Sequence, residues 1–332
     1  MRILVTGAGG FLGQGIAKAL HARGNEVCTL QRGDYPILVG RGITINKGDI
    51  ADKDAVIKAS KNCEAVIHVA AKAGVWGDYQ DYYRSNVTGT LNVIDACRIN
   101  KIHRLVHTSS PSIVFDGEDE DGIDESTPLP LHYLTNYQKT KAEAEKAVLA
   151  ANGMQLATVA LRPHLLFGPG DPHLAPRIIE RARQGKLRLV GKRKNLVDIT
   201  FIDNAVSAHL LALDALVPGA ECAGKVFFIS NDEPMPMEEI VNLILNAAGL
   251  PSVTRTASPR LAYIVGCLME VLYSLFRVKS EPFMTRFIAR QLACSHWYDI
   301  SAAKQILKYE AIVSIDEGMQ ALQLSLKNNN VA

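Results

Sequence analysis

The sequence has no cysteine pair with metal-binding spacing, no excess of basic residues and no signal-peptide pattern. Its six cysteines are scattered without a CxxC motif, which argues against a disulfide framework or a zinc site and favours a reducing compartment. The formal net charge of +2 over 332 residues lacks the basic excess of a nucleic-acid-binding protein. The one conspicuous charge run, residues 116–125, is acidic and is predicted to be a solvated surface segment. We therefore expect a cytoplasmic protein that binds neither a metal nor a nucleic acid.

Long apolar runs are also missing, with one exception. The stretch from Leu261 to Phe276 is the most apolar, but it is shorter than the roughly 20 residues that a membrane-spanning helix needs, and Glu270 interrupts it. Basic residues flank it, so peripheral contact with a membrane surface is one interpretation. We favour a lid over a long acyl chain or an interface with a partner subunit or partner enzyme, because apolar helices of soluble chains usually face protein.

What is present begins with a glycine-rich turn between a strand and a helix. Residues 2–6 form an apolar run typical of a buried strand, and residues 12–23 have the spacing of an amphipathic helix. In the turn GxxGxxG, the first glycine allows a tight bend, the second lets a pyrophosphate approach the backbone, and the third lets the helix pack on the strand. The sequence therefore predicts dinucleotide contacts at Gly7, Gly10, Phe11, Leu12 and Gly13.

The second predicted strand, residues 26–30, indicates which dinucleotide binds. It ends without the acidic residue that usually holds the ribose 2′-hydroxyl of NAD. Gln31 is neutral, and Arg32 can pair with a 2′-phosphate, so we predict NADP(H) as the cofactor, although Asp34 lies nearby.

Two further segments are predicted to border the cofactor at the carboxyl ends of strands, where open α/β sheets bind ligands. The segment KGDI follows a third short strand, where the adenine ring is commonly contacted, and AVIHVAA ends a fourth strand in two small alanines. The contacts predicted there are Asp49, Ile50, Ala70, Ala71 and Lys72. Asn86 opens the next predicted helix, where it either caps that helix or holds backbone near the nicotinamide.

Tyr137 and Lys141 lie four residues apart in the segment 135–147, which is predicted to be helical. That spacing places both side chains on one face of the helix. Because a nearby cation favours the phenolate, we expect the pKa of Tyr137 to lie below the usual value of about 10. The phenol would then exchange a proton with a substrate near neutral pH.

A second hydroxyl donor is needed to fix the oxygen that receives this proton. The predicted strand 104–110 ends in HTSS, so Thr108, Ser109 and Ser110 can each supply it. Spacing alone does not separate the three.

The segments TGAGGFLG, HVAA, HTSS, YQKTK, LRPHLLFGPGD and NLVDITFIDNA resemble the extended short-chain dehydrogenase/reductases, and within them the 3β-hydroxysteroid dehydrogenase branch. The resemblance runs from Met1 to about Met319. It implies an α/β fold: a Rossmann-type doubly wound parallel sheet with a smaller, mainly helical C-terminal substrate region. The implied regions are an NADP-binding domain of residues 1–165, to which residues 196–230 return, and a substrate-binding region of residues 166–195 and 231–332.

The same resemblance implies roles for single residues. Ser110 orients the carbonyl group, Tyr137 gives the proton, and Lys141 keeps Tyr137 acidic and holds the ribose hydroxyls. Thr108 and Pro163 join Tyr137 and Lys141 as cofactor contacts.

Within that branch, RPHLLFGPGDPHLAP, KNLVDITFIDNAV and ISNDEPMP are similar to the bacterial 2-alkyl-3-oxoalkanoate reductases of olefin biosynthesis and, next, to the sterol-4-carboxylate 3-dehydrogenases. The segments AKAGVWGDYQDYY and QRGDYP resemble the reductases more closely. The resemblance implies a homodimer that uses NADPH to reduce a long-chain 2-alkyl-3-oxoalkanoic acid to the 3-hydroxy acid. Sterol oxidation is the neighbouring alternative. The carboxylate of the oxo acid needs a cation or hydrogen-bond donors, for which Lys72, Arg84 and His164 are unranked candidates, and Trp76 is a further candidate substrate contact.

Two rival classes stay open. An NDP-sugar epimerase or dehydratase uses the same tyrosine and lysine, although the apolar stretch near the C-terminus suits a lipid better than a sugar nucleotide. A cofactor-binding protein without catalysis, such as a redox sensor, would keep the glycine turn but has no reason to retain Ser110, Tyr137 and Lys141 together.

Overall fold

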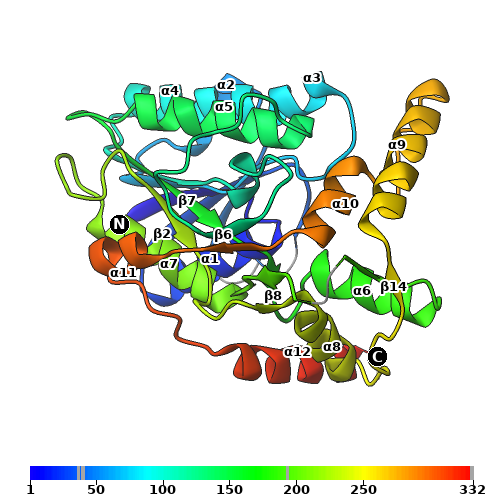
Figure 1. Cartoon of the computed structure of the whole chain (residues 1–332). Helices are drawn as coiled ribbons and strands as arrows, with labels where there is room; N and C mark the ends of the chain where they lie inside the picture. Colours follow the sequence, from blue (N-terminus) through cyan, green and yellow to red (C-terminus); the bar gives the residue numbers. More distant parts are fainter. Residues whose placement is uncertain (36–37, 39–41, 192–193, 330–332) are drawn as a thin grey trace.

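A computed structural model describes residues 1–35, 38, 42–191 and 194–329. Within them, the main sheet has seven parallel strands in the order β12-β7-β5-β4-β1-β2-β3 (Figure 1). These strands are β1 (Arg2–Thr6), β2 (Glu26–Gln31), β3 (Thr44–Lys47), β4 (Ala65–His68), β5 (Arg104–Thr108), β7 (Ala157–Pro163) and β12 (Val226–Ile229). The predicted Rossmann-type doubly wound sheet is confirmed.

The central strands are buried on both faces, which is why they read as continuous apolar runs. The chain runs from β1 outward through β2 and β3, and then crosses back to place β4 on the other side of β1. The loops that follow β1 and β4 therefore leave the sheet in opposite directions and open a crevice at the carboxyl ends of these two strands.

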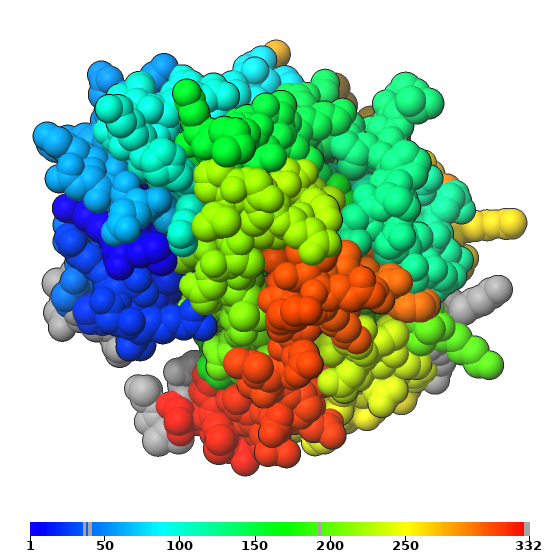
Figure 2. All heavy atoms as spheres, turned by 90° about the vertical axis from the view of Figure 1, so that its left-hand side faces the viewer, coloured from blue at the N-terminus to red at the C-terminus, as the bar shows by residue number. Residues whose placement is uncertain are grey.

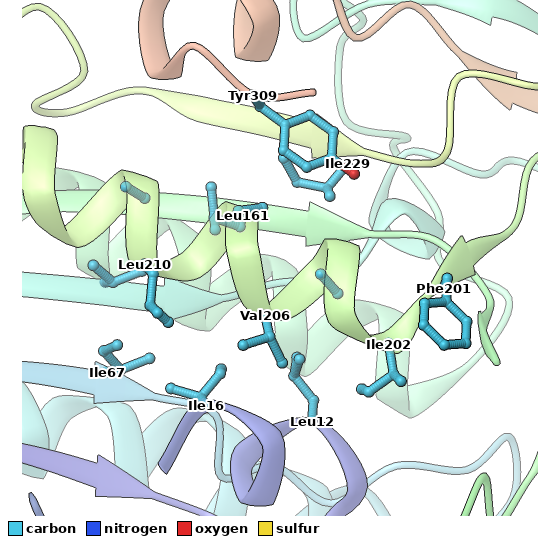
Figure 3. Packing of buried hydrophobic residues seen from close by; sticks show 14 of the residues in the cluster. Leu12, Ile16, Ile67, Leu161, Phe201, Ile202, Val206, Leu210, Ile229 and Tyr309 are labelled. Carbon is cyan, nitrogen blue, oxygen red and sulfur yellow. The ribbon is translucent and has the colours of Figure 1, made fainter. Parts of the chain in front are cut away.

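Helices cover both faces of this sheet, α1 and α7 on one and α2, α4 and α5 on the other (Figure 1). They are α1 (Phe11–Ala22), α2 (Lys53–Ala59), α4 (Gly89–Ile99), α5 (Asn136–Ala150) and α7 (Ile202–Ala215). Shorter helical segments are α3 (Tyr79–Tyr82), the π-helix η1 (Tyr83–Thr88) and the 3₁₀ helix η2 (Pro111–Ile113). Figure 3 shows Leu12 and Ile16 of α1 pointing toward Val206 of α7. This apolar contact fixes α1, and with it the glycine turn, against the sheet.

The C-terminal part adds helices and smaller sheets. Its helices are α6 (Leu174–Arg183), α8 (Met237–Ala247), α9 (Pro259–Leu275), α10 (Arg286–Ala293), α11 (Ser301–Leu307) and α12 (Ile315–Asn329). A mixed sheet has the order β13-β10-β15-β6, made of β6 (Glu120–Ile123), β10 (Leu196–Val197), β13 (Met235–Pro236) and β15 (His296–Tyr298). Two parallel pairs complete it, β8 (Leu166–Phe167) with β11 (Thr200–Phe201) and β9 (Leu189–Val190) with β14 (Thr256–Ala257).

The prediction of a solvated acidic segment at residues 116–125 is wrong for its centre. Glu120 is buried, and β6 pairs in parallel with β15. The Tyr298 hydroxyl donates a hydrogen bond to Glu120 at 2.9 Å, and burial raises the pKa of Glu120 to about 7. The strand that covers this carboxyl lies far along the sequence, so the local charge pattern does not reveal it.

The segment from α7 to β12 returns to the main sheet, where β12 pairs with β7. In Figure 2 this yellow-green segment lies between the blue N-terminal part and the orange residues near α11. The division of the chain into two regions near residue 165 stays a prediction. Among the residues that the structure describes, no helix combines the length and the apolarity that crossing a membrane requires.

Candidate active site

The turn between β1 and α1 requires glycine at two positions. Gly7 adopts a φ of +72°, and a Cβ there would lie 2.7 Å from the backbone nitrogen of Ala70. A Cβ at Gly13 would lie 2.3 Å from the carbonyl oxygen of Gly7, so only glycine lets α1 pack this close to the turn. No side chain caps α1 at Gly10, which leaves the first N–H groups of the helix available to an anion. A pyrophosphate fits this cradle.

A cleft with about 860 Å³ of space, part of it open to solvent, adjoins the turn. Its lining includes these predicted cofactor contacts: Gly7, Gly10, Phe11, Leu12, Gly13, Arg32, Asp49, Ile50, Ala70, Ala71 and Lys72. They come from the carboxyl ends of β1, β2, β3 and β4, on both sides of the point where the strand order reverses. The residues present therefore fit a dinucleotide laid across these strand ends.

Tyr35 is a cleft residue that the sequence did not reveal. Its ring lies so close to the glycine turn that a Cβ on Gly9 would come within 2.1 Å of it. Tyr35 follows the second strand in an irregular segment, and no residue pattern marks it; only the fold brings it over the turn.

The end of β2 carries the charges that bear on cofactor choice. Arg32 lines the cleft, and within the described residues it makes no ion pair. The Asp34 carboxylate pairs with the Lys47 ammonium at 2.7 Å. Asp34, the acidic residue that complicated the prediction of NADP(H), is therefore paired with Lys47.

The helix α5 begins at a capping box, in which Thr135 and Gln138 bond to each other's backbone N–H. The Gln138 side chain also donates hydrogen bonds to the carbonyl oxygens of Ser112 (2.7 Å) and Phe115 (2.9 Å). These contacts dock the first turn of α5, which carries Tyr137, onto the segment that follows Ser110.

As a result, the Ser110 hydroxyl, which is 2.9 Å from Ser112 Oγ, lies near enough to the Tyr137 phenol to lower the pKa of that phenol. One turn later, the Lys141 ammonium donates a hydrogen bond to the carbonyl oxygen of Thr108 at 2.6 Å. The three predicted catalytic side chains thus meet at the carboxyl end of β5. Thr108 turns its hydroxyl to His209 at 2.8 Å, and Ser109 is buried, so of the three hydroxyls Ser110 is the one that acts on the pKa of the phenol.

The expected direction of the Tyr137 pKa is wrong for this structure. Loss of solvent raises the pKa of Tyr137 above 10, and the hydrogen bond with Ser110 offsets this only in part. The reason is that Lys141 directs its charge toward the Thr108 carbonyl rather than to the phenol oxygen. Burial also lowers the pKa of Lys141, to about 8, against the opposing effect of Glu145.

Two buried histidines lie beneath Lys141, on adjacent strands. His107 Nε2 is 3.4 Å from the Lys141 nitrogen, and the His107 and His68 rings are 5.2 Å apart between centroids. Burial and the Lys141 charge lower the pKa of His68 to about 3 and that of His107 well below its usual value. Both rings are therefore neutral at pH 7, and Lys141 is the one cation of this group.

Asn86 lies in the π-helix η1 and does not cap it. Its side-chain oxygen accepts from the Lys72 N–H at 2.7 Å, and its amide donates to the Lys72 carbonyl (3.2 Å) and to the Thr140 hydroxyl (3.1 Å). Of the two sequence interpretations, the structure agrees with the one in which Asn86 holds backbone. It fixes the end of the cofactor cleft to the helix that carries Tyr137.

The remaining predicted contacts lie away from the cleft lining or have partners of their own. Pro163 ends β7. Trp76 donates from Nε1 to the Val278 carbonyl at 3.1 Å. Arg84 pairs with Asp49 at 2.8 Å, on the cofactor side, and His164 is buried against His296 and Tyr298. The structure does not bring Arg84 and His164 to the phenol, and their roles in substrate binding stay predictions.

Comparison with known proteins identifies a family and several relatives of this chain. Residues 4–260 match the model of the 3-beta hydroxysteroid dehydrogenase/isomerase family. The chain is 51% identical over 330 residues to the 2-alkyl-3-oxoalkanoate reductase of Shewanella oneidensis, covering 97% of this chain and 85% of that protein. It is 50% identical over 328 residues to the protein of the same name from Stenotrophomonas maltophilia, with 98% and 99% covered.

More distant relatives share the fold. The sterol-4-alpha-carboxylate 3-dehydrogenase, decarboxylating, of Mus musculus is 33% identical over 324 residues, covering 95% of this chain and 88% of that protein. The structure of MoeE5 in complex with UDP-glucose and NAD covers 100% of both chains, with 25% sequence identity and a TM-score of 0.76. The resemblance predicted from the motifs is confirmed: the chain belongs to the 3-beta hydroxysteroid dehydrogenase/isomerase family and is an oxidoreductase that uses a nicotinamide cofactor.

Proposed function

We propose that the protein reduces the 3-oxo group of a long-chain 2-alkyl-3-oxoalkanoic acid to the 3-hydroxy group, with NADPH as the reductant. The observation that carries the proposal is that Ser110, Tyr137 and Lys141 come together at the carboxyl end of β5, the strand next to β4, whose carboxyl end borders the cofactor cleft. The substrate class comes from the two reductases that share about half of their residues with this chain along nearly its full length.

Different residues of the cleft bind different parts of the cofactor. The N-terminus of α1 receives the pyrophosphate, and Asp49 and Ile50 border the adenine side. When bound, the nicotinamide cofactor supplies a hydride to the carbonyl carbon of the substrate. Lys72, held at its backbone by Asn86, lies at the end of the cleft nearest to α5.

The proton for the carbonyl oxygen comes from Tyr137. Its raised pKa keeps the phenol protonated at neutral pH, which is the form that a proton donor needs in a reduction. Ser110, which lies near the phenol, donates a hydrogen bond to the same carbonyl oxygen of the substrate and fixes its position. We propose that on cofactor binding the Lys141 ammonium moves from the Thr108 carbonyl toward the phenol oxygen and stabilises the phenolate that forms. The carbonyl thus gains one hydride and one proton.

We propose NADPH rather than NADH because Arg32 faces the cleft without an ion pair among the described residues, while Asp34 is neutralised by Lys47. A guanidinium pairs well with the 2′-phosphate of the adenosine ribose. A carboxylate that is held by a lysine competes poorly for a 2′-hydroxyl.

The reaction is tested by following NADPH absorbance with a 2-alkyl-3-oxo acid and, with NADP⁺ in the reverse direction, with a 4-carboxysterol. A UDP-sugar is tested by chromatography of its products, because an epimerase or dehydratase returns the hydride to the sugar and leaves the absorbance unchanged. Because 3-oxo acids lose carbon dioxide on standing, oxidation of the stable 2-alkyl-3-hydroxy acid by NADP⁺ serves as a second measurement. We expect turnover with the oxo acid and the hydroxy acid. Turnover of the sterol or the sugar nucleotide alone would overturn the proposal.

We also propose that the enzyme works in the cytoplasm as a homodimer. All six cysteines are free thiols, as a reducing compartment requires. On α4, which packs beside α5, Leu91 and Ile99 are exposed and suit a contact between two copies. Light scattering should give the mass of a dimer for the wild type, and a monomer for the variant Leu91→Glu/Ile99→Glu. A monomeric wild type would contradict this proposal.

A further inference from the structure

Among the described residues, the helix α9 carries more exposed large apolar side chains than any other helix. It projects away from the body of the molecule (Figure 1). Large apolar side chains recur along it every three or four residues, which places them on one face. They are exposed by 46% to 71%, and they are Leu261, Ile264, Leu268, Val271, Leu272 and Leu275. Phe276 continues the same surface and is 71% exposed.

The other face of α9 is fixed to the protein, which holds the apolar face outward. Ala262 and Gly266 are buried there, and a Cβ on Gly266 would lie 2.6 Å from the backbone of Thr285. The Glu270 carboxylate accepts from the Arg286 N–H and from its guanidinium, both at 2.7 Å. The helix therefore cannot turn its apolar face inward without breaking a close backbone contact and an ion pair.

The charged residues beside the apolar face that form no ion pair within the described chain are all basic. Arg260 lies at its beginning, and Arg277 and Lys279 lie at its end; all three are exposed, and in the described part of the chain none forms an ion pair. The acidic residues of this segment are both neutralised, Glu270 by Arg286 and Glu281 by Arg177. An apolar stripe between unpaired cations is complementary to a surface of anionic headgroups over hydrocarbon.

The same charges disfavour a second copy of the chain as the occupant. If two α9 helices packed antiparallel, Arg260 of one copy would meet Arg277 and Lys279 of the other. If they packed parallel, each cation would meet its own equivalent. Like charges at such close range repel, whereas anionic lipid headgroups neutralise them.

We propose that α9 docks the protein on an anionic lipid bilayer, with the helix lying in the plane of the interface and its apolar side chains among the acyl chains. This contact is peripheral, because no helix of the described residues is long and apolar enough to span the bilayer. Binding needs no substrate and no cofactor.

The C-terminal end of α9 contacts the loop that follows the cofactor cleft. Trp76, four residues after Lys72, donates a hydrogen bond to the Val278 carbonyl, and its ring packs edge-on against Tyr273 at 6.1 Å between centroids. A docked α9 therefore places the approach to Tyr137 at the lipid surface, where long alkyl chains partition. This second step rests on the proposed substrate class; the docking itself does not.

The test is sedimentation of the full chain with vesicles made of equal parts phosphatidylcholine and phosphatidylglycerol. We expect the wild type to sediment, and the variant Leu268→Glu/Val271→Glu to bind at least about tenfold more weakly. The variant Arg277→Glu/Lys279→Glu should lose binding to these vesicles while its weaker binding to pure phosphatidylcholine changes little. The matched control Met154→Glu/Leu324→Glu changes two other exposed apolar residues, 77% and 61% exposed, and should bind as the wild type does.

Failure of the wild type to sediment overturns the proposal, and so does equal binding by the Leu268→Glu/Val271→Glu variant and the control. If that variant instead dissociates a dimer of the wild type, or releases a partner enzyme, α9 is a protein interface and the lipid assignment is wrong. Vesicle binding is measured without substrate, so it stands apart from the reductase assay. Turnover of a short, water-soluble 3-oxo acid should be the same for the wild type and both double variants of α9.

Discussion

The cofactor side and the substrate side of this molecule are built from contacts of different range. On the cofactor side, Gly7, Gly10 and Gly13 lie within one turn, and the other lining residues follow directly after strands. On the substrate side, the contacts join distant residues: Trp76 bonds to the carbonyl of Val278, 202 residues away, and Glu120 accepts from Tyr298, 178 residues away. Local sequence specifies the first kind of site and says little about the second, so the coenzyme class is easier to infer than the substrate.

The largest effect is expected at the phenol where the two sides meet. Tyr137→Phe removes the proton donor and should lower kcat/KM by a factor of about 10² to 10⁴, while NADPH binding is unchanged. Steady-state kinetics and the fluorescence of bound NADPH measure the two quantities separately. Tyr79→Phe, which removes a hydroxyl bonded to Glu143 on the surface, is the control and should keep full activity. Equal activity of both variants would break the assignment.

The burial of the charged Lys141 side chain should lower the stability of the folded protein. Its pKa is about 8 in the folded chain and 10.5 as a free side chain, so between these values the unfolded chain binds more protons and stability rises with pH. Below pH 8 the full cost of burying the charge is present. Lys141→Met should therefore raise the free energy of unfolding by about 2 kcal/mol at pH 7, with a smaller gain at pH 10, and abolish activity.

Thermal unfolding at both pH values, monitored by circular dichroism, measures this effect. The exposed Lys139 of the same helix gives the control: Lys139→Met should change stability by less than about 0.5 kcal/mol at either pH. A gain for Lys141→Met that does not depend on pH would contradict the burial of its charge.

The glycine turn should be sensitive to substitution at Gly13, whereas a glycine outside the turn should tolerate the same change. Gly13→Ala places a methyl group 2.3 Å from the carbonyl oxygen of Gly7, so α1 must move; we expect a loss of about 1 to 3 kcal/mol in stability and weaker NADPH binding. Gly153→Ala meets no atom within 4 Å and serves as the control. Calorimetry of unfolding and of NADPH binding tests both variants. Unimpaired NADPH binding by Gly13→Ala would separate the turn from the cofactor.

The smallest effect concerns the choice between the two nicotinamide cofactors. Arg32→Ala should raise the KM for NADPH about tenfold and leave that for NADH nearly unchanged. Lys47→Ala frees the Asp34 carboxylate and should favour NADH slightly. Kinetics with both cofactors measure the ratio of the two kcat/KM values. An equal loss with NADPH and NADH on changing Arg32 would contradict the 2′-phosphate assignment.

The sequence predicts the main sheet and the glycine cradle because glycine spacing and apolar runs act locally. It also identifies Tyr137 and Lys141, since helix geometry places residues four apart on one face. It mispredicts the direction of the Tyr137 pKa, because that depends on where the Lys141 ammonium points, and the Thr108 carbonyl that attracts it comes from another strand. Tyr35 and His107 have no pattern that marks them.

The apolar stretch at α9 also shows that a local pattern does not reveal what a residue contacts. Its periodicity predicts a helix with one apolar face, and the structure has that helix. We expected protein to cover the face, as a lid or at an interface, yet within the described chain its large side chains remain exposed. The residue pattern predicts that the helix has an apolar face but not what contacts that face, because the contact is made by elements elsewhere in the fold or by another molecule.

The central claim is that Ser110, Tyr137 and Lys141 act on a carbonyl group held beside a dinucleotide at the glycine turn. A crystal structure of the enzyme with NADP⁺ and a 2-alkyl-3-hydroxy acid tests it most directly. We predict the pyrophosphate at the N-terminus of α1, with the substrate hydroxyl about 2.6 to 3.2 Å from both the Tyr137 and Ser110 oxygens. A substrate bound away from Tyr137, or a dinucleotide bound away from Gly7 and Gly13, would contradict it.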